Sequence, residues 1–329
     1  MNEMVLVTGS AGFIGSAVEK ALSEAGYDVR AGVRNTARPQ RPGVVTVPCD
    51  LDRPEQVRLA VQGADAVVHC AYGDAAAMPR QCAALLDAMS AAGVTRLVHF
   101  SSIAVYGDAS MPDADAPIAG AALEGDYAKG KGVCEKRVRD WVGSDPQRCA
   151  MILRPGIVYG AGSPFWIEKL SRRIEAGMWG DFGVAGEAPA PLVHVDDVAE
   201  AACAALAKTT RMRARIETVD LVGPQTPTWN AYAQAVANAL SAGPLPRVGP
   251  VRLAWWRLLA LPAKAWRRLG LPGFARASLA PGAGELRVMA RSATYDMDRT
   301  ARLLGKAPSI GLGEGIRRSF ADQETRPEP

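Results

Sequence analysis

The chain has 329 residues, of which 48% are hydrophobic and 22% are charged, and its formal net charge is +4. This composition is typical of a globular protein that buries one large core with a smaller part attached. The modest charge argues against a nucleic-acid-binding face. No stretch approaches the roughly 18 apolar residues that a membrane-spanning helix needs.

The first half of the chain alternates short apolar runs with helical patterns. Strands are predicted at 4–8, 28–33, 44–48, 66–70, 96–101 and 150–153, and helices at 14–25, 54–62, 79–92 and 127–142. Strands and helices that alternate in this way predict an α/β fold. We expect a doubly wound parallel sheet of the Rossmann type, with helices on both faces.

The regular alternation of strand and helix patterns ends after Pro155, where Gly and Pro become frequent. Regular elements return at 192–195 and 198–207, and further helices are predicted at 229–240 and 251–271. We therefore expect a dinucleotide-binding domain and a smaller C-terminal substrate lobe. The domain would comprise residues 1–155 with 191–222 returning to it, the lobe residues 156–190 and 223–320, and a polar tail residues 321–329.

The cysteines, the N-terminal residues and the histidines bear on cellular location and on metal binding. Six cysteines are scattered without a CxxC pair, which is typical of small buried residues in a reducing compartment. The N-terminus leads directly into a strand pattern instead of a secretory signal, so we expect a cytoplasmic protein. Only three histidines are present, with no carboxylate–histidine cluster at ligand spacing, so no metal site is expected.

A glycine loop lies between the first strand and the first helix, with Gly9, Gly12 and Gly15 at its turns. Glycine there permits a tight turn, close approach of the backbone to a pyrophosphate, and close helix–strand packing. The N-terminus of the following helix offers backbone N–H groups and a partial positive charge to phosphates. The predicted nicotinamide-dinucleotide contacts in this loop are Gly9, Ala11, Gly12, Phe13, Ile14 and Gly15.

The end of the second strand should decide between NAD and NADP. An acid there would bond the ribose hydroxyls of NAD, but the chain has Val33-Arg34-Asn35 instead. Arg34 can pair with a 2′-phosphate through its guanidinium, which favours NADP; a solvated surface arginine is the alternative. Asp50 and Leu51, after the third strand, are predicted at the adenine, with a plain turn as the alternative for Asp50.

A candidate catalytic pair lies on the helix predicted at 127–142. Tyr127 and Lys131 are one helical turn apart and so share a face. A phenol with a pKa near 10 is a poor acid or base at neutral pH. A neighbouring ammonium favours the phenolate, so we expect Lys131 to lower the pKa of Tyr127. Ser102, just beyond the fifth strand, can hold a substrate oxygen beside the phenol.

With these residues the chain resembles the extended short-chain dehydrogenase/reductase family, including its epimerase/dehydratase-like and 3β-hydroxysteroid-dehydrogenase-like branches. The resemblance rests on TGSAGFIG, SSIAVYG, YAKGK, LRPGIVYGAG at 153–162, HVDDVAEA at 194–201 and YDMDRTARLLG at 295–305.

The resemblance implies an enzyme that moves a hydride to or from C4 of nicotinamide. Ser102, Tyr127 and Lys131 match the catalytic positions of the family, and Tyr127 and Lys131 also contact the cofactor. Cys70 and Ala71 match the cofactor loop after the fourth strand. Pro155 matches the loop that flanks the nicotinamide. The resemblance also implies a homodimer through the helices at 79–92 and 127–142.

The substrate is less sharply indicated. Nucleotide-sugar members of the family commonly carry an arginine four residues before the histidine of the HVDD-like motif, where this chain has Ala190. Residues 251–271 interleave tryptophans with arginines and lysines. Such a segment can cover an apolar pocket or lie peripherally on an anionic membrane, with an ordinary lobe helix as the alternative. It resembles the insert of 3β-hydroxysteroid-dehydrogenase-like members.

The leading hypothesis is therefore an NAD(P)-dependent oxidoreductase that acts on a hydroxyl or ketone carbon of a hydrophobic small molecule. A nucleotide-sugar epimerase or dehydratase with tightly bound cofactor is the alternative enzyme. A cofactor-sensing or scaffold protein on the same fold is the non-enzymatic alternative, against which the intact Ser102, Tyr127 and Lys131 argue.

Overall fold

The chain divides into two compact units. Unit 1 comprises residues 1–156, 195–222 and 295–308, and unit 2 comprises residues 157–194, 223–294 and 309–329. The computed structural model describes residues 2–39, 41–116, 118, 123, 125–249, 251–256, 258 and 277–321.

Unit 1 contains a parallel sheet of seven strands, in the order β3-β2-β1-β4-β5-β6-β9. The strands are β1 (Met4–Thr8), β2 (Asp28–Val33), β3 (Val44–Pro48), β4 (Ala66–His69), β5 (Arg96–Phe100), β6 (Cys149–Pro155) and β9 (Arg215–Leu221). The strand order reverses between β1 and β4, which is where ligands bind in open sheets of this kind. The predicted doubly wound fold is confirmed.

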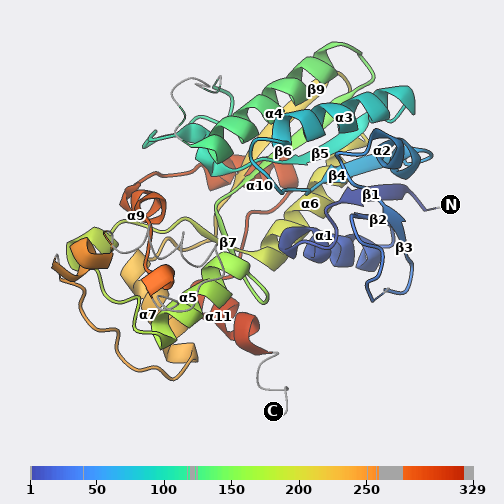
Figure 1. Ribbon diagram of the computed structural model, residues 1–329. Helices are drawn as coiled ribbons and strands as arrows, with labels where there is room; N and C mark the ends of the chain where they lie inside the picture. Colours follow the sequence, from blue (N-terminus) through green and yellow to red (C-terminus); the bar gives the residue numbers. More distant parts are fainter. Residues whose placement is uncertain are drawn as a thin grey trace. The chain divides into compact units, whose positions relative to one another are not determined.

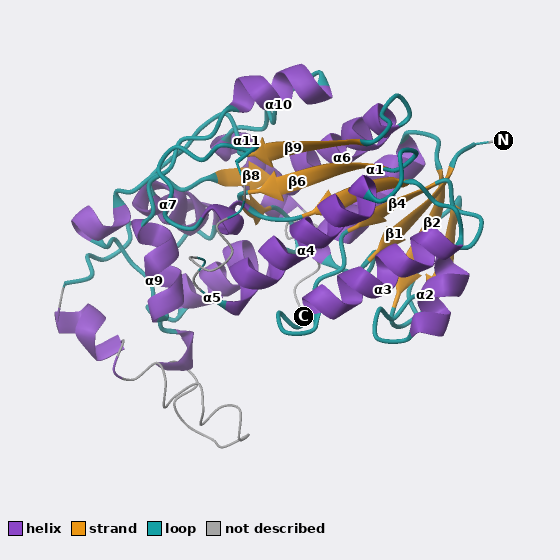
Figure 2. Cartoon of the chain, turned by 90° about the horizontal axis from the view of Figure 1, so that it is seen from above, coloured by secondary structure: helices purple, strands orange, loops and turns teal. Residues whose placement is uncertain are grey.

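Helices cover both faces of this sheet (Figures 1 and 2). The helices of unit 1 are α1 (Phe13–Glu24), α2 (Pro54–Val61), α3 (Met78–Ala91), α4 (Asp126–Gly143), α6 (Val195–Thr209) and α10 (Met297–Leu304), with a short 3₁₀ helix η1 (Ile103–Tyr106). In Figure 1, α2, α3 and α4 lie on one face, and α1 and α6 pack together on the other.

The core explains why the central strands form. Strand side chains alternate between the two faces, and Leu6, Val67 and Leu97 on adjacent strands all point toward α2, α3 and α4. Each of these three side chains is at most 1% exposed. Strands covered by helices on both faces read as continuous apolar runs, which is why the sequence indicates them clearly.

Unit 2 is built around a second apolar core that includes Tyr159, Trp229 and Tyr232. Its two short parallel strands are β7 (Ile157–Tyr159) and β8 (Leu192–His194). Its described helices include α5 (Lys169–Glu175), α7 (Trp229–Ala239), α9 (Ala283–Ala290) and α11 (Leu312–Phe320), with a short π-helix η3 (Pro164–Glu168) and short 3₁₀ helices η4 (Gly183–Gly186) and η5 (Ala277–Leu279).

Two expected boundaries need correction. The sequence places residues 295–308 in the smaller lobe, but they belong to unit 1, because α10 packs on β9 and the Thr300 hydroxyl donates to the carbonyl of Asp220 at 2.7 Å. Residues 191–194 were assigned to the dinucleotide-binding domain, but they belong to unit 2 because β8 pairs with β7.

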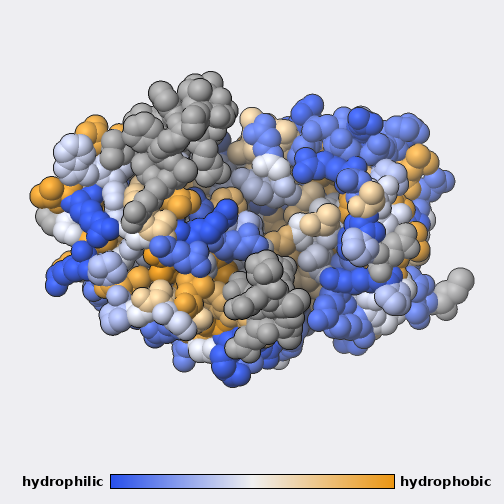
Figure 3. All heavy atoms as spheres, turned by 60° about the horizontal axis from the view of Figure 1, so that its bottom comes forward, coloured by the Kyte–Doolittle hydropathy of each residue, from blue (hydrophilic) through white to orange (hydrophobic). Residues whose placement is uncertain are grey.

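The tryptophan-rich segment predicted as a helix at 251–271 is described only at residues 251–256 and 258. Trp256 is buried against Phe182, with 6.5 Å between their ring centroids, whereas Trp255 is 58% exposed. Hydrophobic and hydrophilic side chains are mixed on the face drawn in Figure 3. Within the described residues, no helix is both long and apolar enough to cross a membrane. The expected tail is described only at Ala321.

Candidate active site

The glycine loop joins β1 to α1 and can be built only with glycine at two positions. Gly9 has a φ of +70°, and a Cβ atom there would lie 2.6 Å from the Cα atom of Ala71. A Cβ atom on Gly15 would lie 2.2 Å from the carbonyl oxygen of Gly9. Contacts under 3 Å are not tolerated, so both glycines are required for the close approach of loop, helix and neighbouring strand.

The start of α1 fits a dinucleotide phosphate. Its N-cap residue is Gly12, which has no side chain to bond the first backbone N–H groups. The first turn of the helix, which includes Phe13 and Ile14, contains no acidic residue. The partial positive charge of the helix terminus is therefore not neutralised by its own first turn, and the backbone there can bind an anion.

The second expected cofactor loop follows β4 and lies directly beside the first. The backbone N–H of Cys70 donates to the carbonyl of Thr8 at 3.2 Å, and that of Ala71 to the Thr8 hydroxyl at 3.4 Å. Burial raises the pKa of the Cys70 thiol, which keeps it protonated and unreactive. Pro155, at the end of β6, lies at the same edge of the sheet, because parallel strands end together.

The three residues predicted around the adenosine differ in exposure and in the contacts that they make. Arg34 is exposed and directly follows β2. The carboxylate of Asp50 accepts the N–H of Asp52 at 3.1 Å and lies 3.6 Å from the Arg53 guanidinium. This supports the plain-turn alternative for Asp50. The side chain of Leu51 is buried in the core beneath α2 and α3, so only its backbone can face a ligand.

The structure brings Ser102, Tyr127 and Lys131 together at the carboxyl edge of the sheet. Ser102 precedes η1, where its hydroxyl accepts the N–H of Ala104 at 3.2 Å and lies near enough to the phenol of Tyr127 to lower the pKa of that phenol. Lys131 is buried in α4, and its Nζ donates to the carbonyl of Phe100 at 2.7 Å. The Lys131 Nζ lies 6.0 Å from the centre of the Tyr127 ring.

Of the two adjacent serines after β5, the contacts favour Ser102 over Ser101. Ser101 is buried, and its hydroxyl has no hydrogen-bond partner in the part of the chain that the structure describes. Its backbone N–H donates to the carbonyl of Leu153 at 2.7 Å, which joins β5 to β6. Ser102 is thus the serine whose hydroxyl reaches Tyr127.

The pKa of Tyr127 does not follow the expected direction. Desolvation raises the pKa of its phenol, and the hydrogen bond from Ser102 opposes that rise. The expected lowering by Lys131 is wrong for this structure, because the lysine amine donates to Phe100. Burial also lowers the pKa of Lys131. The group that favours the Tyr127 phenolate here is the Ser102 hydroxyl.

A polar network holds the segment that carries Ser102. Tyr106, at the end of η1, donates to the carboxylate of Asp220 at 2.7 and 3.0 Å and accepts from Arg154 at 2.7 Å. Arg154 also pairs with the buried Glu135 of α4 through two hydrogen bonds of 2.8 and 2.6 Å. Because the charges of this buried pair are matched and hydrogen-bonded, η1, α4 and β6 are held in one arrangement.

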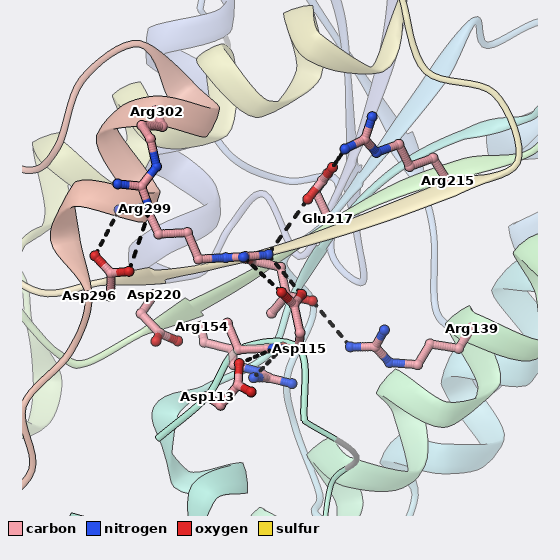
Figure 4. A network of polar contacts seen from close by, with 12 residues as sticks. Asp113, Asp115, Arg139, Arg154, Arg215, Glu217, Asp220, Asp296, Arg299 and Arg302 are labelled. Carbon is pink, nitrogen blue, oxygen red and sulfur yellow. Dashed lines mark hydrogen bonds and ion pairs between the residues drawn. The ribbon is translucent and has the colours of Figure 1, made fainter. Parts of the chain in front are cut away.

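The same network continues to α10. Figure 4 shows Arg299 of α10 directed at Asp115, which lies in the connection between η1 and α4. The guanidinium makes two parallel bonds of 2.8 Å to that carboxylate, and its Nε donates to the carbonyl of Thr218 at 3.2 Å. A bidentate arginine–carboxylate pair fixes orientation as well as distance.

His69, Cys82 and His99 form a buried cluster that the sequence spacing did not indicate. One ligand atom from each lies within 4.8 Å of the others. Burial and the nearby charge of Lys131 together lower the pKa of His69 to about 3. A neighbouring ammonium opposes binding of a cation. The cluster is therefore a neutral packing arrangement beneath Lys131.

Comparison with known proteins decides the family. Residues 5–217 match the NAD dependent epimerase/dehydratase family. The chain belongs to this family. The resemblance to extended short-chain dehydrogenases/reductases is thereby confirmed, and the chain is an NAD(P)-dependent enzyme.

Relatives of this enzyme include both reductases and epimerases. A 2-alkyl-3-oxoalkanoate reductase of Stenotrophomonas maltophilia is 28% identical over 343 residues, covering 95% of this chain and 97% of that protein. A UDP-glucose 4-epimerase of Vibrio cholerae is 27% identical over 222 residues, covering 61% and 65%. The structure of UDP-glucose 4-epimerase from Bifidobacterium longum in complex with NAD+ and UDP is 18% identical, with a TM-score of 0.71 and 98% and 99% coverage, and supports the fold.

Proposed function

We propose that this enzyme reduces the ketone of a small, largely apolar molecule with NADPH. The observation that carries the proposal is the placement of Ser102, Tyr127 and the buried Lys131 together, with the Lys131 Nζ 6.0 Å from the centre of the Tyr127 ring one helical turn away on α4. These side chains provide a hydrogen-bond donor, a proton donor and a positive charge at one edge of the sheet. This combination suits proton transfer to a carbonyl oxygen.

In the proposed reaction, Ser102 donates a hydrogen bond to the substrate carbonyl oxygen and orients it beside Tyr127. Tyr127 donates its phenolic proton to that oxygen and becomes a phenolate. When bound, the reduced nicotinamide supplies the hydride that the carbonyl carbon accepts. In the reverse direction the Tyr127 phenolate accepts the hydroxyl proton of an alcohol.

The relatives favour a ketone that carries an alkyl chain. The match to the 2-alkyl-3-oxoalkanoate reductase spans nearly the whole of both chains, whereas the match to the UDP-glucose 4-epimerase spans about two thirds. Ala190 supports the same choice, because a diphosphate without a paired arginine loses a charge-assisted hydrogen bond. Epimerisation of a nucleotide sugar is the second candidate, and the Vibrio cholerae relative favours it.

The proposal includes three finer predictions. NADP is the preferred cofactor, because Arg34 directly follows β2, where an NAD-binding protein carries an acid. A homodimer through α3 and α4 and a cytoplasmic location both stay predictions from the sequence.

A turnover assay with stoichiometry tests the proposal. Purified enzyme with NADPH and a 2-alkyl-3-oxoalkanoate should consume one NADPH per ketone reduced, followed at 340 nm and by product mass. Replacement of Tyr127 with Phe should lower kcat/KM by roughly 10² to 10⁴, because the proton donor is lost. Cofactor binding, measured by calorimetry, should be unchanged. Conversion of UDP-glucose without net NADPH consumption would instead identify the epimerase.

A further inference from the structure

A carboxylate is buried on the inner face of α1, beside the glycine loop. Glu19 lies between Val18 and Leu22, and like them it is 0% exposed. Its carboxylate accepts a hydrogen bond from the hydroxyl of Ser10 in the glycine loop. A buried carboxylate costs several kcal/mol unless it is paired, so its partners identify what it is there to hold.

Those partners are two arginines from the connection between β2 and β3. Arg38 makes two parallel bonds of 2.8 and 2.9 Å to Glu19, and only 16% of its side chain is exposed. Arg41 lies 3.5 Å from the same carboxylate and donates to the carbonyl of Ser16 in α1 at 2.8 Å. The buried carboxylate of Glu19 therefore holds the β2–β3 connection against the start of α1.

The cluster lies where a dinucleotide places its adenosine ribose. The backbone N–H groups of Gly9 and Ser10 donate to the carbonyl of Gly32 at 3.0 and 3.3 Å, which joins the glycine loop to the end of β2. In doubly wound folds the ribose 2′ position is recognised at this junction. Ser10 thus connects Glu19, and through it Arg38, to the place where a 2′-phosphate would lie.

The charges at this junction fit a phosphate. Residues 34–41 contain three arginines and no acid, and Glu19 supplies one negative charge, so the junction as a whole, with the exposed Arg34 included, carries a surplus of two positive charges. A phosphate monoester carries about −1.5 to −2 at pH 7. Arg38 has five N–H donors, of which two are used by Glu19, so the others can bind a phosphate oxygen.

We propose that Glu19 is a positioning residue that holds Arg38 and Arg41 as the clamp for the 2′-phosphate of NADP(H). The inference rests on the proposed NADP preference and deepens it, since the sequence alone pointed to the exposed Arg34. A guanidinium fixed before binding loses less conformational entropy than a free one, which is how a buried acid improves the affinity of basic side chains for phosphate.

Calorimetry on the full chain tests the clamp without catalysis. The probes are adenosine 2′,5′-bisphosphate, 5′-AMP and inorganic phosphate. The unchanged protein should prefer the bisphosphate over 5′-AMP by tenfold or more. Arg38→Gln and Arg41→Gln should each weaken bisphosphate binding by about tenfold and leave 5′-AMP binding unchanged, because a charge-assisted hydrogen bond is lost. Arg58→Gln, in an exposed pair with Glu55, is the matched control for a general loss of charge.

Glu19→Gln separates positioning from simple electrostatics. A carboxylate repels phosphate, so its removal alone would tighten bisphosphate binding. Positioning predicts the opposite: weaker bisphosphate binding, by about fivefold or more, in a protein whose circular dichroism is unchanged. Tighter or equal binding overturns the role of Glu19, and if this variant does not fold, the Arg38 and Arg41 variants still decide whether the clamp exists.

Three further outcomes keep the inference apart from the proposed function. If only Arg34→Gln weakens bisphosphate binding, the NADP preference stands and the clamp is refuted. If the unchanged protein binds 5′-AMP as tightly as the bisphosphate, the NADP preference itself fails. Inorganic phosphate that binds as tightly as the bisphosphate would identify a free anion site in place of a cofactor site.

Discussion

At the scale of single residues, burial and one neighbouring hydroxyl act in opposite directions on the pKa of the candidate proton donor. The phenol of Tyr127 packs edge-on against Tyr72, with ring centroids 5.3 Å apart, and desolvation raises its pKa. The Ser102 hydroxyl is the group that lowers it. Ser102 therefore has two tasks that follow one another: in the free enzyme it keeps the phenol ionisable, and with substrate bound its single hydroxyl proton is donated to the substrate oxygen.

Replacement of Ser102 with Ala should show both tasks. In the direction of alcohol oxidation the phenolate must accept a proton, so the rate rises as the pH passes the pKa of Tyr127. Without the Ser102 hydroxyl that pKa is higher, and the midpoint of the pH–rate profile should move to higher pH. We also expect kcat to fall by roughly 10² or more, as when an oxyanion donor is removed.

A neighbouring serine provides the control. Ser101→Ala removes a buried hydroxyl that makes no hydrogen bond among the described residues, so the midpoint should stay in place. A Ser102→Ala enzyme with reduced kcat but an unshifted pH–rate profile would show that Ser102 orients the substrate without tuning Tyr127.

At the scale of elements, the junction of β1, the glycine loop and α1 is the most sterically constrained part of unit 1. The carbonyl of Gly9 approaches Gly15 so closely that an added Cβ atom would lie 2.2 Å from its oxygen and 2.8 Å from its carbon. Both are backbone atoms, so neither can rotate away as a flexible side chain would. The close packing of α1 on the loop is what brings the helix N-terminus to the phosphates.

Gly15→Ala should therefore displace α1 from the loop. We expect a loss of about 1–3 kcal/mol of stability from overpacking, seen as a lower Tm, and at least a tenfold loss of cofactor affinity by calorimetry. Gly143→Ala is the matched control, because a Cβ atom at this end of α4 would meet nothing within 4 Å. Cofactor affinity that survives in Gly15→Ala would show that the loop adjusts.

The sequence predicts helices and strands correctly where burial imposes a regular pattern of apolar residues. Strands such as β1 are apolar throughout because both faces are covered, and the loop glycines are visible as residues. β9 was missed because it alternates charged and apolar residues at the edge of the sheet. Assignment of α10 to the wrong unit has another cause. α10 packs on β9, which lies about 75 residues earlier in the chain, and a local sequence pattern cannot indicate a contact over that separation.

The candidate site shows the same limit. Ser102, Tyr127 and Lys131 could be proposed because motif and helical spacing place them together. Glu19 could not be proposed, because a helix pattern shows which face is buried but not which loop packs on it. Its one visible signal is a charged residue between Val18 and Leu22 on the apolar face of α1.

At the scale of the whole molecule, unit 1 is assembled from three separate stretches of sequence, and buried polar groups join them. Asp220 lies on β9, accepts from Tyr106 of the first stretch, and receives Thr300 of the last stretch at its backbone carbonyl. Arg299 adds the tie between α10 and Asp115. These contacts carry titratable groups, so the stability of the assembled unit should depend on pH.

Asp220 gives this dependence a definite sign. Burial raises its pKa from 3.8 to about 6, although Tyr106 and Arg154 oppose the rise. Between pH 4 and 6 the folded chain therefore holds a proton that the unfolded chain has lost. Stability from this group then falls as the pH rises through that window and is level above it. The shift corresponds to at most about 3 kcal/mol.

Asp220→Asn isolates the effect, because asparagine does not titrate but still accepts the Tyr106 hydroxyl. The unfolding free energy of the unchanged protein minus that of the Asp220→Asn variant should fall by about 1–3 kcal/mol between pH 4 and pH 6.5 and then stay constant. Thermal and urea unfolding of both proteins at several pH values measures this difference, in which all other titrating groups cancel. A difference that is constant across this range, or that grows with pH, would mean that Asp220 is ionised throughout and that its ion pairs outweigh its burial.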